Sequence, residues 1–165
     1  MSKKISIEFE YEFFSSLKDL SMVEQKLIRL SRAAAKKAYA PYSGFKVGAA
    51  VLLENDQIII GNNQENVAYP AGMCAERVAI FSASAQYPDV PIHTIAISAY
   101  TDKFIFLKPV TPCGSCRQVI AEYEHVHNKP IRLLFTSMQD EVYKVHGATA
   151  LLPLLFYEQN LKTHP

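Results

Sequence analysis

Three cysteines carry the clearest chemical signal in the chain. Cys113 and Cys116 follow Pro112 at a spacing that lets two thiolates bind one tetrahedral zinc ion, although such a pair can also work as a redox dithiol. Cys74 lies 39 residues upstream and offers a third sulfur ligand. Because an odd number of cysteines cannot all pair within one chain, thiolate chemistry in a reducing compartment fits better than a disulfide framework.

Glu76 stands two residues after Cys74 and provides an acid–base group for such a site. Three protein ligands leave the fourth position of a zinc ion open to water, which becomes acidic near neutral pH. Glu76 is placed to move the proton of that water without binding the metal itself. Three thiolates make the site negative, and the adjacent Arg77 is expected to offset this charge by donating hydrogen bonds to them. Helices predicted to begin at Cys74 and Cys113 should also favour the thiolate form at their N-termini.

Hydrophobic periodicity predicts the strands and helices that must position these groups. The apolar residues of 5–13 alternate with serine and glutamates, which predicts a strand at the edge of a sheet. Ser21 and Glu24 form a capping box that begins a helix. The run 47–53 is too continuously apolar for a sheet with one solvated face, so helices should cover both faces of a mixed sheet. The expected strands are 5–13, 47–53, 57–60, 92–100, 131–136 and 142–146, and the expected helices are 21–39, 74–86, 113–123 and 148–156.

Composition limits the classes of protein to which the chain can belong. It has 165 residues, of which 49% are hydrophobic and 20% charged, and a formal net charge of +1. These proportions predict one compact domain over 1–165 and exclude a disordered tail or a disulfide-dense miniprotein. The balanced charge predicts no nucleic-acid partner and no membrane anchor. Glutamates interrupt the apolar core that a secretion signal would need after Lys3 and Lys4, so the expected location is cytoplasmic.

Taken together, the motifs resemble those of the cytidine deaminase superfamily, whose zinc site combines three Cys or His/Cys ligands with a glutamate that does not bind the metal. Further segments are similar to those of the small, homotetrameric cytidine deaminases, and they follow one another in the right order. These segments are the loop and strand Pro41–Ala50, the ribose-binding segment Gly61–Asn66, Tyr69-Pro70 before Cys74–Arg77, the second zinc segment Pro112–Gln118, and Leu151-Leu152-Pro153 with Phe156. The resemblance covers 21–157 and leaves 1–20 as an N-terminal extension; the stretch 101–110 also looks extended.

The resemblance implies a fold and a set of residue roles. The fold would be a three-layer α-β-α sandwich with a mixed five-stranded sheet, to which 5–13 would add an extra N-terminal edge strand. One zinc ion per subunit would bind Cys74, Cys113 and Cys116, and Glu76 would move protons to the pyrimidine ring nitrogen and then to departing ammonia. The other implied roles concern the substrate: Asn63 and Glu65 would hydrogen-bond the sugar hydroxyls, Phe45 would pack near the base, the Ala75 backbone would read its polar edge, and Phe156 would reach a neighbouring subunit's site beside Tyr42 and Tyr69.

The implied activity is hydrolytic deamination of cytidine and 2′-deoxycytidine in pyrimidine salvage, and several alternatives stay open. A deaminase of blasticidin S is the nearest, while a polynucleotide deaminase fits the low net charge poorly. A redox dithiol would leave Cys74 and Glu76 unexplained, and a zinc-stabilised binding module would need a fourth ligand such as His93 or His146. Asn63 and Glu65 could instead cap a loop. Phe45 and Phe156 could instead be ordinary core residues.

Overall fold

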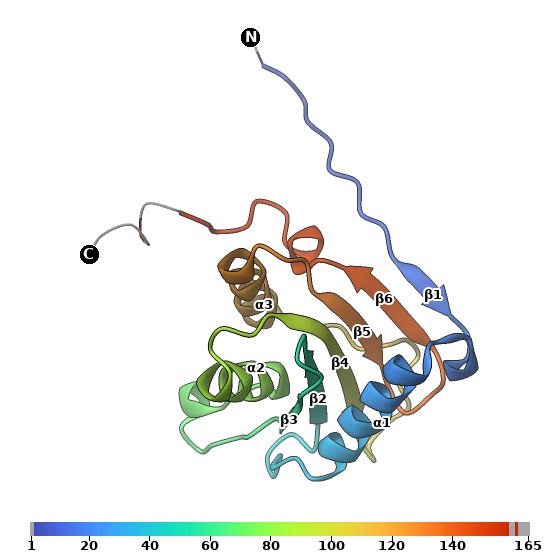
Figure 1. Ribbon diagram of the computed structural model, residues 1–165. Helices are drawn as coiled ribbons and strands as arrows, with labels where there is room; N and C mark the ends of the chain where they lie inside the picture. The colour runs from blue at the N-terminus through green and yellow to red at the C-terminus, as the bar shows by residue number, and fades with distance from the viewer. Residues whose placement is uncertain (1, 159–160, 162–165) are drawn as a thin grey trace.

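The computed structural model describes residues 2–158 and 161, and these form a sheet between two layers of helices (Figure 1). The strand order is β1-β6-β5-β4-β2-β3, in which β4 and β5 run parallel and every other neighbouring pair is antiparallel. The strands are β1 (Glu12–Phe14), β2 (Lys46–Leu53), β3 (Ile58–Asn62), β4 (Ile92–Tyr100), β5 (Arg132–Thr136) and β6 (Val142–His146). The helices are α1 (Met22–Lys36), α2 (Ala75–Gln86) and α3 (Gly114–His127), with short 3-10 helices η1 (Leu17–Asp19), η2 (Tyr69–Ala71) and η3 (Ala148–Leu151).

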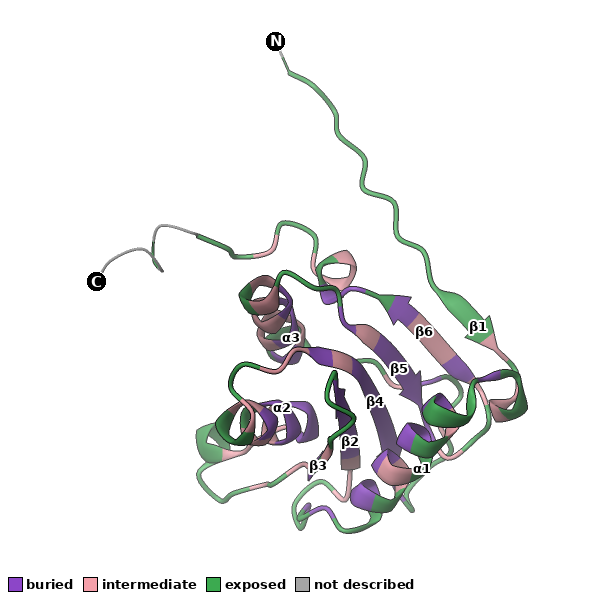
Figure 2. Cartoon of the chain, in the orientation of Figure 1, coloured by how far each residue is buried: buried purple, intermediate pink, exposed green. Residues whose placement is uncertain are grey.

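Successive residues of the central strands point into two separate cores, as the period of a strand requires. In β2, Ala49, Val51 and Leu53 belong to the core under α2 and α3, whereas Ala50 and Leu52 belong to the core under α1. Figure 2 shows the middle of the sheet buried between these layers. The predicted mixed sheet with helices on both faces is therefore confirmed. It has six strands rather than five, and the additional one is the edge strand β1.

Two glycines let helices approach the sheet very closely. A Cβ atom on Gly48 of β2 would lie 2.0 Å from the carbonyl oxygen of Ser31 in α1. A Cβ atom on Gly61 of β3 would lie 2.6 Å from the backbone nitrogen of Ala79 in α2. Because real Cβ atoms do not come so near to backbone, only glycine fits at these two positions. Gly61 thereby sets the depth at which α2, and the cysteine at its N-terminus, lies on the sheet.

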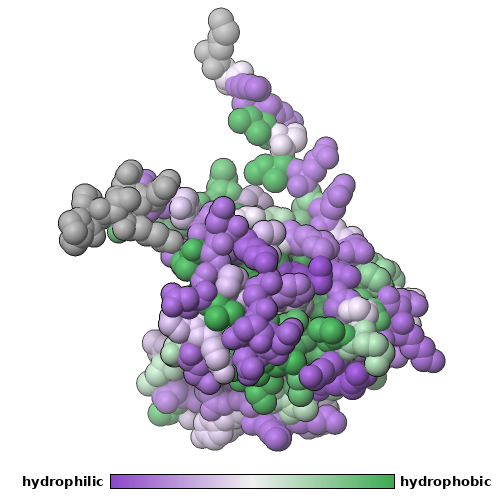
Figure 3. All heavy atoms as spheres, viewed as in Figure 1, coloured by the Kyte–Doolittle hydropathy of each residue, from purple (hydrophilic) through white to green (hydrophobic). Residues whose placement is uncertain are grey.

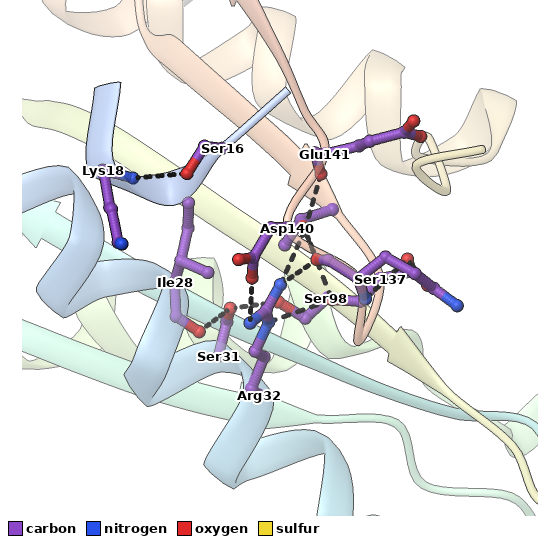
Figure 4. A network of polar contacts seen from close by, with 11 residues as sticks. Ser16, Lys18, Ile28, Ser31, Arg32, Ser98, Ser137, Asp140 and Glu141 are labelled. Carbon is purple, nitrogen blue, oxygen red and sulfur yellow. Dashed lines mark hydrogen bonds and ion pairs between the residues drawn. The ribbon is translucent and has the colours of Figure 1, made fainter. Parts of the chain in front are cut away.

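A polar network fastens α1 to the turn between β5 and β6 (Figure 4). Arg32 Nε donates to the carbonyl oxygen of Ser137 at 2.9 Å, and Arg32 Nη1 lies 3.8 Å from an oxygen of Asp140. Beneath it, the hydroxyls of Ser31 and Ser98 hydrogen-bond to each other in the buried layer between α1 and β4. These contacts satisfy polar groups that the close packing of α1 removes from water.

The helix predicted over 113–123 continues to His127, and the helix predicted over 21–39 ends at Lys36. Two other predicted elements differ more strongly in extent. The strand predicted over 5–13 pairs with β6 only at Glu12–Phe14. Glu12 already lies opposite Lys144, near the end of β6, and no strand of the described chain lies beside residues 2–11. The helix predicted over 148–156 is a single 3-10 turn, Ala148–Leu151; Pro153 cannot continue a helix, and Leu154 has a φ of 57°. Among the described residues, no helix has both the length and the apolarity that spanning a membrane requires.

Candidate functional site

The three cysteines, distant in sequence, come together where α2 and α3 begin. Cys74 is the N-cap of α2, and Cys113 is the N-cap of α3. The Sγ atoms of Cys74 and Cys113 lie 4.0 Å apart, those of Cys113 and Cys116 lie 3.5 Å apart, and all three lie within 4.8 Å of one another. Sulfurs bound to one tetrahedral zinc ion at about 2.3 Å stand about 3.8 Å apart, so this cluster fits that ion. In the described part of the chain, no further His, Cys, Asp or Glu joins it.

The charges around the cluster also suit a divalent cation. Arg77 Nη2 donates to Cys74 Sγ at 3.7 Å. A hydrogen bond from the Cys116 thiol, assisted by Arg77 and opposed by burial, lowers the pKa of Cys74 to about 5. The same contact with the Cys74 thiolate raises the pKa of Cys116. Three thiolates so close together repel one another unless a cation lies between them, and a metal ion would supply that charge.

Glu76 lies beside the cysteine cluster in the first turn of α2. Its side chain is buried, yet it lines a cavity together with Cys74 and Cys113. Burial raises the pKa of Glu76, and the negative charge of Cys74 raises it further. A carboxyl group with a raised pKa accepts a proton more readily than an ordinary carboxyl group, which suits a role in acid–base catalysis.

The cavity has a volume of about 590 Å³, which suits a ligand of nucleoside size. It gathers most of the residues predicted for the site and brings in several others. The predicted residues that line it are Tyr42, Phe45, Asn63, Glu65, Tyr69, Cys74, Glu76 and Cys113. The lining residues to which sequence analysis assigned no role are Ser43, Val47, Gln64, Asn66, Gly72, Met73, Ile97, Val110 and Thr111. Ser43, Val47, Gln64 and Asn66 lie within motifs that carry the family resemblance, so the motifs themselves were the available signal.

Four of the predicted residues lie outside the lining of the cavity, and one of them, Cys116, is the fully buried member of the sulfur cluster. Ala75 is fully buried at the start of α2, between Cys74 and Glu76. Arg77 points to the sulfur cluster instead of the open space. Phe156 is 73% exposed, and its carbonyl oxygen accepts a hydrogen bond from Gln118 Nε2 of α3 at 2.9 Å.

Asn63 and Glu65 hold the loop that forms one wall of the cavity. Asn63 Oδ1 accepts from the backbone nitrogen of Val47 at 2.7 Å, and its Nδ2 donates to the carbonyl oxygen of Phe45 at 2.9 Å. Glu65 accepts from the backbone nitrogens of Tyr42 at 2.8 Å and Ser43 at 3.2 Å, and from the Ser43 hydroxyl. The hydrogen bond from that hydroxyl, with the two from the backbone, lowers the pKa of Glu65. Loop capping, one of the two roles considered for this pair, is thus present.

The segment 101–110 forms part of the same wall. The rings of Phe45 and Phe106 meet edge to face with centroids 5.6 Å apart, and Phe106 meets Phe104 in the same way at 5.2 Å. Lys103 Nζ donates to the carbonyl oxygen of Ser43. Across the cavity mouth, Tyr42 and Tyr69 also meet edge to face at 6.2 Å. The extended segment therefore supports the loop that carries Phe45.

Comparison with known families agrees with this geometry. Residues 21–128 match the family described as the cytidine and deoxycytidylate deaminase zinc-binding region, which spans the sulfur cluster, Glu76 and the loop 42–47. The chain belongs to this family. Its zinc-binding character agrees with the fit of a zinc ion to the three sulfurs.

Relatives and solved structures give the same assignment over nearly their whole length. A cytidine deaminase of Halalkalibacterium halodurans is 44% identical over 140 residues, which are 85% of this chain and 98% of that protein. One of Sporosarcina psychrophila is 39% identical over 83% of this chain and 93% of its own length. A 1.6 Å crystal structure of cytidine deaminase from Burkholderia pseudomallei superposes with a TM-score of 0.69 and 37% identity, covering 83% of this chain and all of that one. The family match begins at residue 21, so residues 1–20 lie outside it.

Proposed function

We propose that the chain is a zinc-dependent enzyme that converts cytidine and 2′-deoxycytidine, with one water molecule, to uridine or 2′-deoxyuridine and ammonia. The observation that carries the proposal is a buried glutamate beside three clustered sulfurs, where Glu76, Cys74 and Cys113 line a cavity of about 590 Å³. Membership of a zinc-binding deaminase family supports the same reaction class. The cytidine deaminases named above are the guide to the substrate.

Glu76 is the proposed acid–base residue of the reaction. A zinc ion held by Cys74, Cys113 and Cys116 supplies Lewis-acid activation of water at neutral pH. Glu76 accepts one proton from the attacking water and delivers it to the pyrimidine ring nitrogen. It then carries the second proton of that water, from the newly formed hydroxyl, to the amino group, which departs as ammonia. Burial raises the pKa of Glu76 above the ordinary value of a carboxyl group, which favours its uptake of a proton from water.

The remaining predicted residues take the proposed substrate roles. Asn63 and Glu65 bind the sugar hydroxyls, and Phe45 forms the apolar wall beside the base. The backbone nitrogen of Ala75 lies at the N-terminus of α2, where helix geometry leaves an amide without an intrahelical acceptor, so it can donate to the polar edge of the base. Arg77 offsets the negative charge of the cysteine cluster through its hydrogen bond to Cys74.

The proposal includes a homotetramer with shared active sites. Phe156 is exposed and lines no part of its own chain's cavity, which is consistent with its reaching a neighbouring subunit. Tyr42 and Tyr69 stand exposed at the mouth, where they would form the shared wall. Pyrimidine salvage in the cytoplasm completes the proposal, since three free cysteines suit a reducing compartment. Replacing Phe156 with alanine should weaken activity; unchanged activity and unchanged assembly would remove the shared site from the proposal.

The decisive experiment measures uridine formed from cytidine by the purified, zinc-loaded protein beside its Glu76→Gln variant. Glutamine keeps the size of the side chain and removes the proton-carrying group, so turnover should fall by about 10²–10⁴-fold while zinc content stays near one per chain. Near-normal turnover in the variant would refute the role of Glu76. No turnover by a folded, zinc-loaded wild-type protein would refute cytidine as substrate, and blasticidin S would then be tested before a non-catalytic zinc module is accepted.

A further inference from the structure

Residues 2–11, here called the arm, are an exposed apolar segment with no partner strand in the described chain. Figure 1 shows the arm leaving β1 and extending away from the sheet. Its larger apolar residues are strongly exposed, with Ile5 at 78%, Ile7 at 61% and Phe9 at 44%. A row of apolar side chains on a strand edge with unpaired backbone groups is a template for pairing with another strand. The arm also lies outside the family match, so the reaction described above does not explain it.

The two faces of the arm differ in character. Odd-numbered positions from 5 to 11 carry Ile or an aromatic residue, and the intervening positions carry Ser6, Glu8 and Glu10. In Figure 3 the apolar side chains lie mainly on one side of the arm and the charged ones on the other. The apolar stripe continues onto the body of the protein, because Tyr11 meets Phe9 at 5.9 Å and Tyr143 of β6 at 4.9 Å between ring centroids. The arm therefore has the alternation of a strand, with one apolar face, and its edges are free to pair with another strand.

The arm cannot complete this strand on β6 of its own chain. Glu12 pairs with Lys144, and β6 ends two residues later at His146, where Gly147, with a φ of 87°, redirects the chain. A partner strand for the arm must then come from another molecule.

The order of charges along the arm makes it complementary to itself in antiparallel orientation. Lys4 lies near the start of the arm and Glu10 near its end. When Ile7 lies opposite Ile7 of a second copy, Lys4 faces Glu10 twice, and Ile5 faces Phe9 twice. A shift of two residues in one direction places Glu8 opposite Glu8, and a shift in the other direction leaves two apolar pairs, both Ile5 with Ile7, in place of three. A shift of one residue places apolar side chains opposite charged ones.

We infer that the arm pairs with the arm of a second copy of this chain as an antiparallel two-stranded ribbon centred on Ile7. The interface is isologous, as a two-fold axis through Ile7 requires. Across the ribbon, Lys4 faces Glu10, Ile5 faces Phe9 and Ile7 faces Ile7, and such cross-strand pairs stabilise antiparallel strands. The remaining pairs are Ser6 with Glu8 and Lys3 with Tyr11.

Disulfide formation between arms tests the register directly in the full-length, zinc-loaded protein. Ile7→Cys should give a covalent dimer on mild oxidation with diamide, because the two residues face each other at the axis. Ile5→Cys is the matched control, since two copies of residue 5 would stand roughly 13 Å apart along the ribbon, beyond the reach of a disulfide. Wild-type protein reports any contribution of the native cysteines. Equal dimer yields from Ile5→Cys and Ile7→Cys, or a yield from Ile7→Cys no higher than wild type, would overturn the inference.

Exchanging the charges at positions 4 and 10 in the Ile7→Cys variant distinguishes pairing between two arms from docking of the arm on another surface. Lys4→Glu alone and Glu10→Lys alone each place like charges opposite one another, so each should lose most of the covalent dimer. A mixture of the two variants should recover it as a heterodimer, because positions 4 and 10 of one variant then face the opposite charge on the other.

A single variant controls for a general effect of charge. Glu8→Lys makes the same change of charge as Glu10→Lys but opposite Ser6, so on the Ile7→Cys background it should keep most of the covalent dimer that Glu10→Lys loses. A mixture of Lys4→Glu with Glu10→Lys that cross-links no better than either alone would refute the ribbon. None of these readouts depends on activity, so they stand whether or not the proposed reaction is correct.

Discussion

Phe106 offers the sharpest test of how the cavity wall is held. The side chain is half-buried and meets Phe45, a wall residue, edge to face at 5.6 Å. An edge-to-face aromatic pair contributes about 0.5–1.5 kcal/mol beyond its buried area. If Phe106→Ala removes that support from the wall that substrate contacts, the KM for cytidine should rise roughly two- to twelve-fold. The kcat should stay near wild type, because Glu76 and the cysteines lie on other segments.

The assay is a set of saturation curves for cytidine, with kcat and KM obtained separately. Leu107→Ala is the matched control, since Leu107 is the next residue and is 91% exposed, so its truncation should change neither constant. Phe106→Tyr keeps the ring and should recover most of the wild-type KM. An unchanged KM in Phe106→Ala, whatever its kcat, would refute the idea that this segment supports the binding wall.

Three further predictions concern stability and metal binding. Burial raises the pKa of Glu24, but hydrogen bonds, led by the one from Lys144, outweigh burial, so the pKa lies below its ordinary value of 4.5. The Glu24 carboxylate therefore stabilises the folded state at pH values above 4.5, and this stabilisation is lost as the pH falls through the lowered pKa. Glu24→Gln should therefore unfold more readily at pH 7, by about 1–3 kcal/mol in chemical denaturation, and lose less stability than wild type on acidification; an unchanged acid profile would contradict this. Gly48→Ala should prevent stable folding, measured by thermal melting, because its Cβ would lie 2.0 Å from a backbone oxygen, whereas Gly114→Ala, which meets nothing within 4 Å, should melt like wild type. Arg77→Gln should release zinc to a colorimetric chelator faster than wild type, and equal release rates would remove its charge-balancing role.

Local sequence patterns predicted the sheet and the helices on its two faces, because these patterns arise from residues that are close together in the chain. The continuous apolar run of β2 required helices on both faces, and alternate residues of that strand do enter two cores. The capping box of Ser21 and Glu24 begins α1 as expected. The arm shows where this logic ends. Its period-two pattern is that of a strand, but strand formation also needs a partner, and only the length of β6 decides that none is present within the described chain.

The cluster of cysteines could be predicted from the sequence, because motif spacing and the starts of two helices define it. The cavity wall formed by the segment 101–110 could not be predicted. Phe106 and Lys103 belong to a segment without periodicity, and their contacts with Phe45 and Ser43 bridge about 60 residues. Arg32 reaches the turn after β5 across 105 residues. Contacts of this kind depend on how the sheet brings loops together, and nothing in the composition of those loops encodes their partners.

The two roles considered for Glu65 also turn out to be compatible. Its carboxylate already accepts hydrogen bonds from Tyr42, from the Ser43 nitrogen and from the Ser43 hydroxyl. Two carboxylate oxygens offer about four acceptor positions, so one remains for a sugar hydroxyl without displacement of the loop. An amide has only one acceptor oxygen and would leave converging donors unsatisfied. A carboxylate at this position can therefore hold the wall and receive the substrate at once, and binding of the sugar would add to the same set of bonds that orders the loop carrying Phe45.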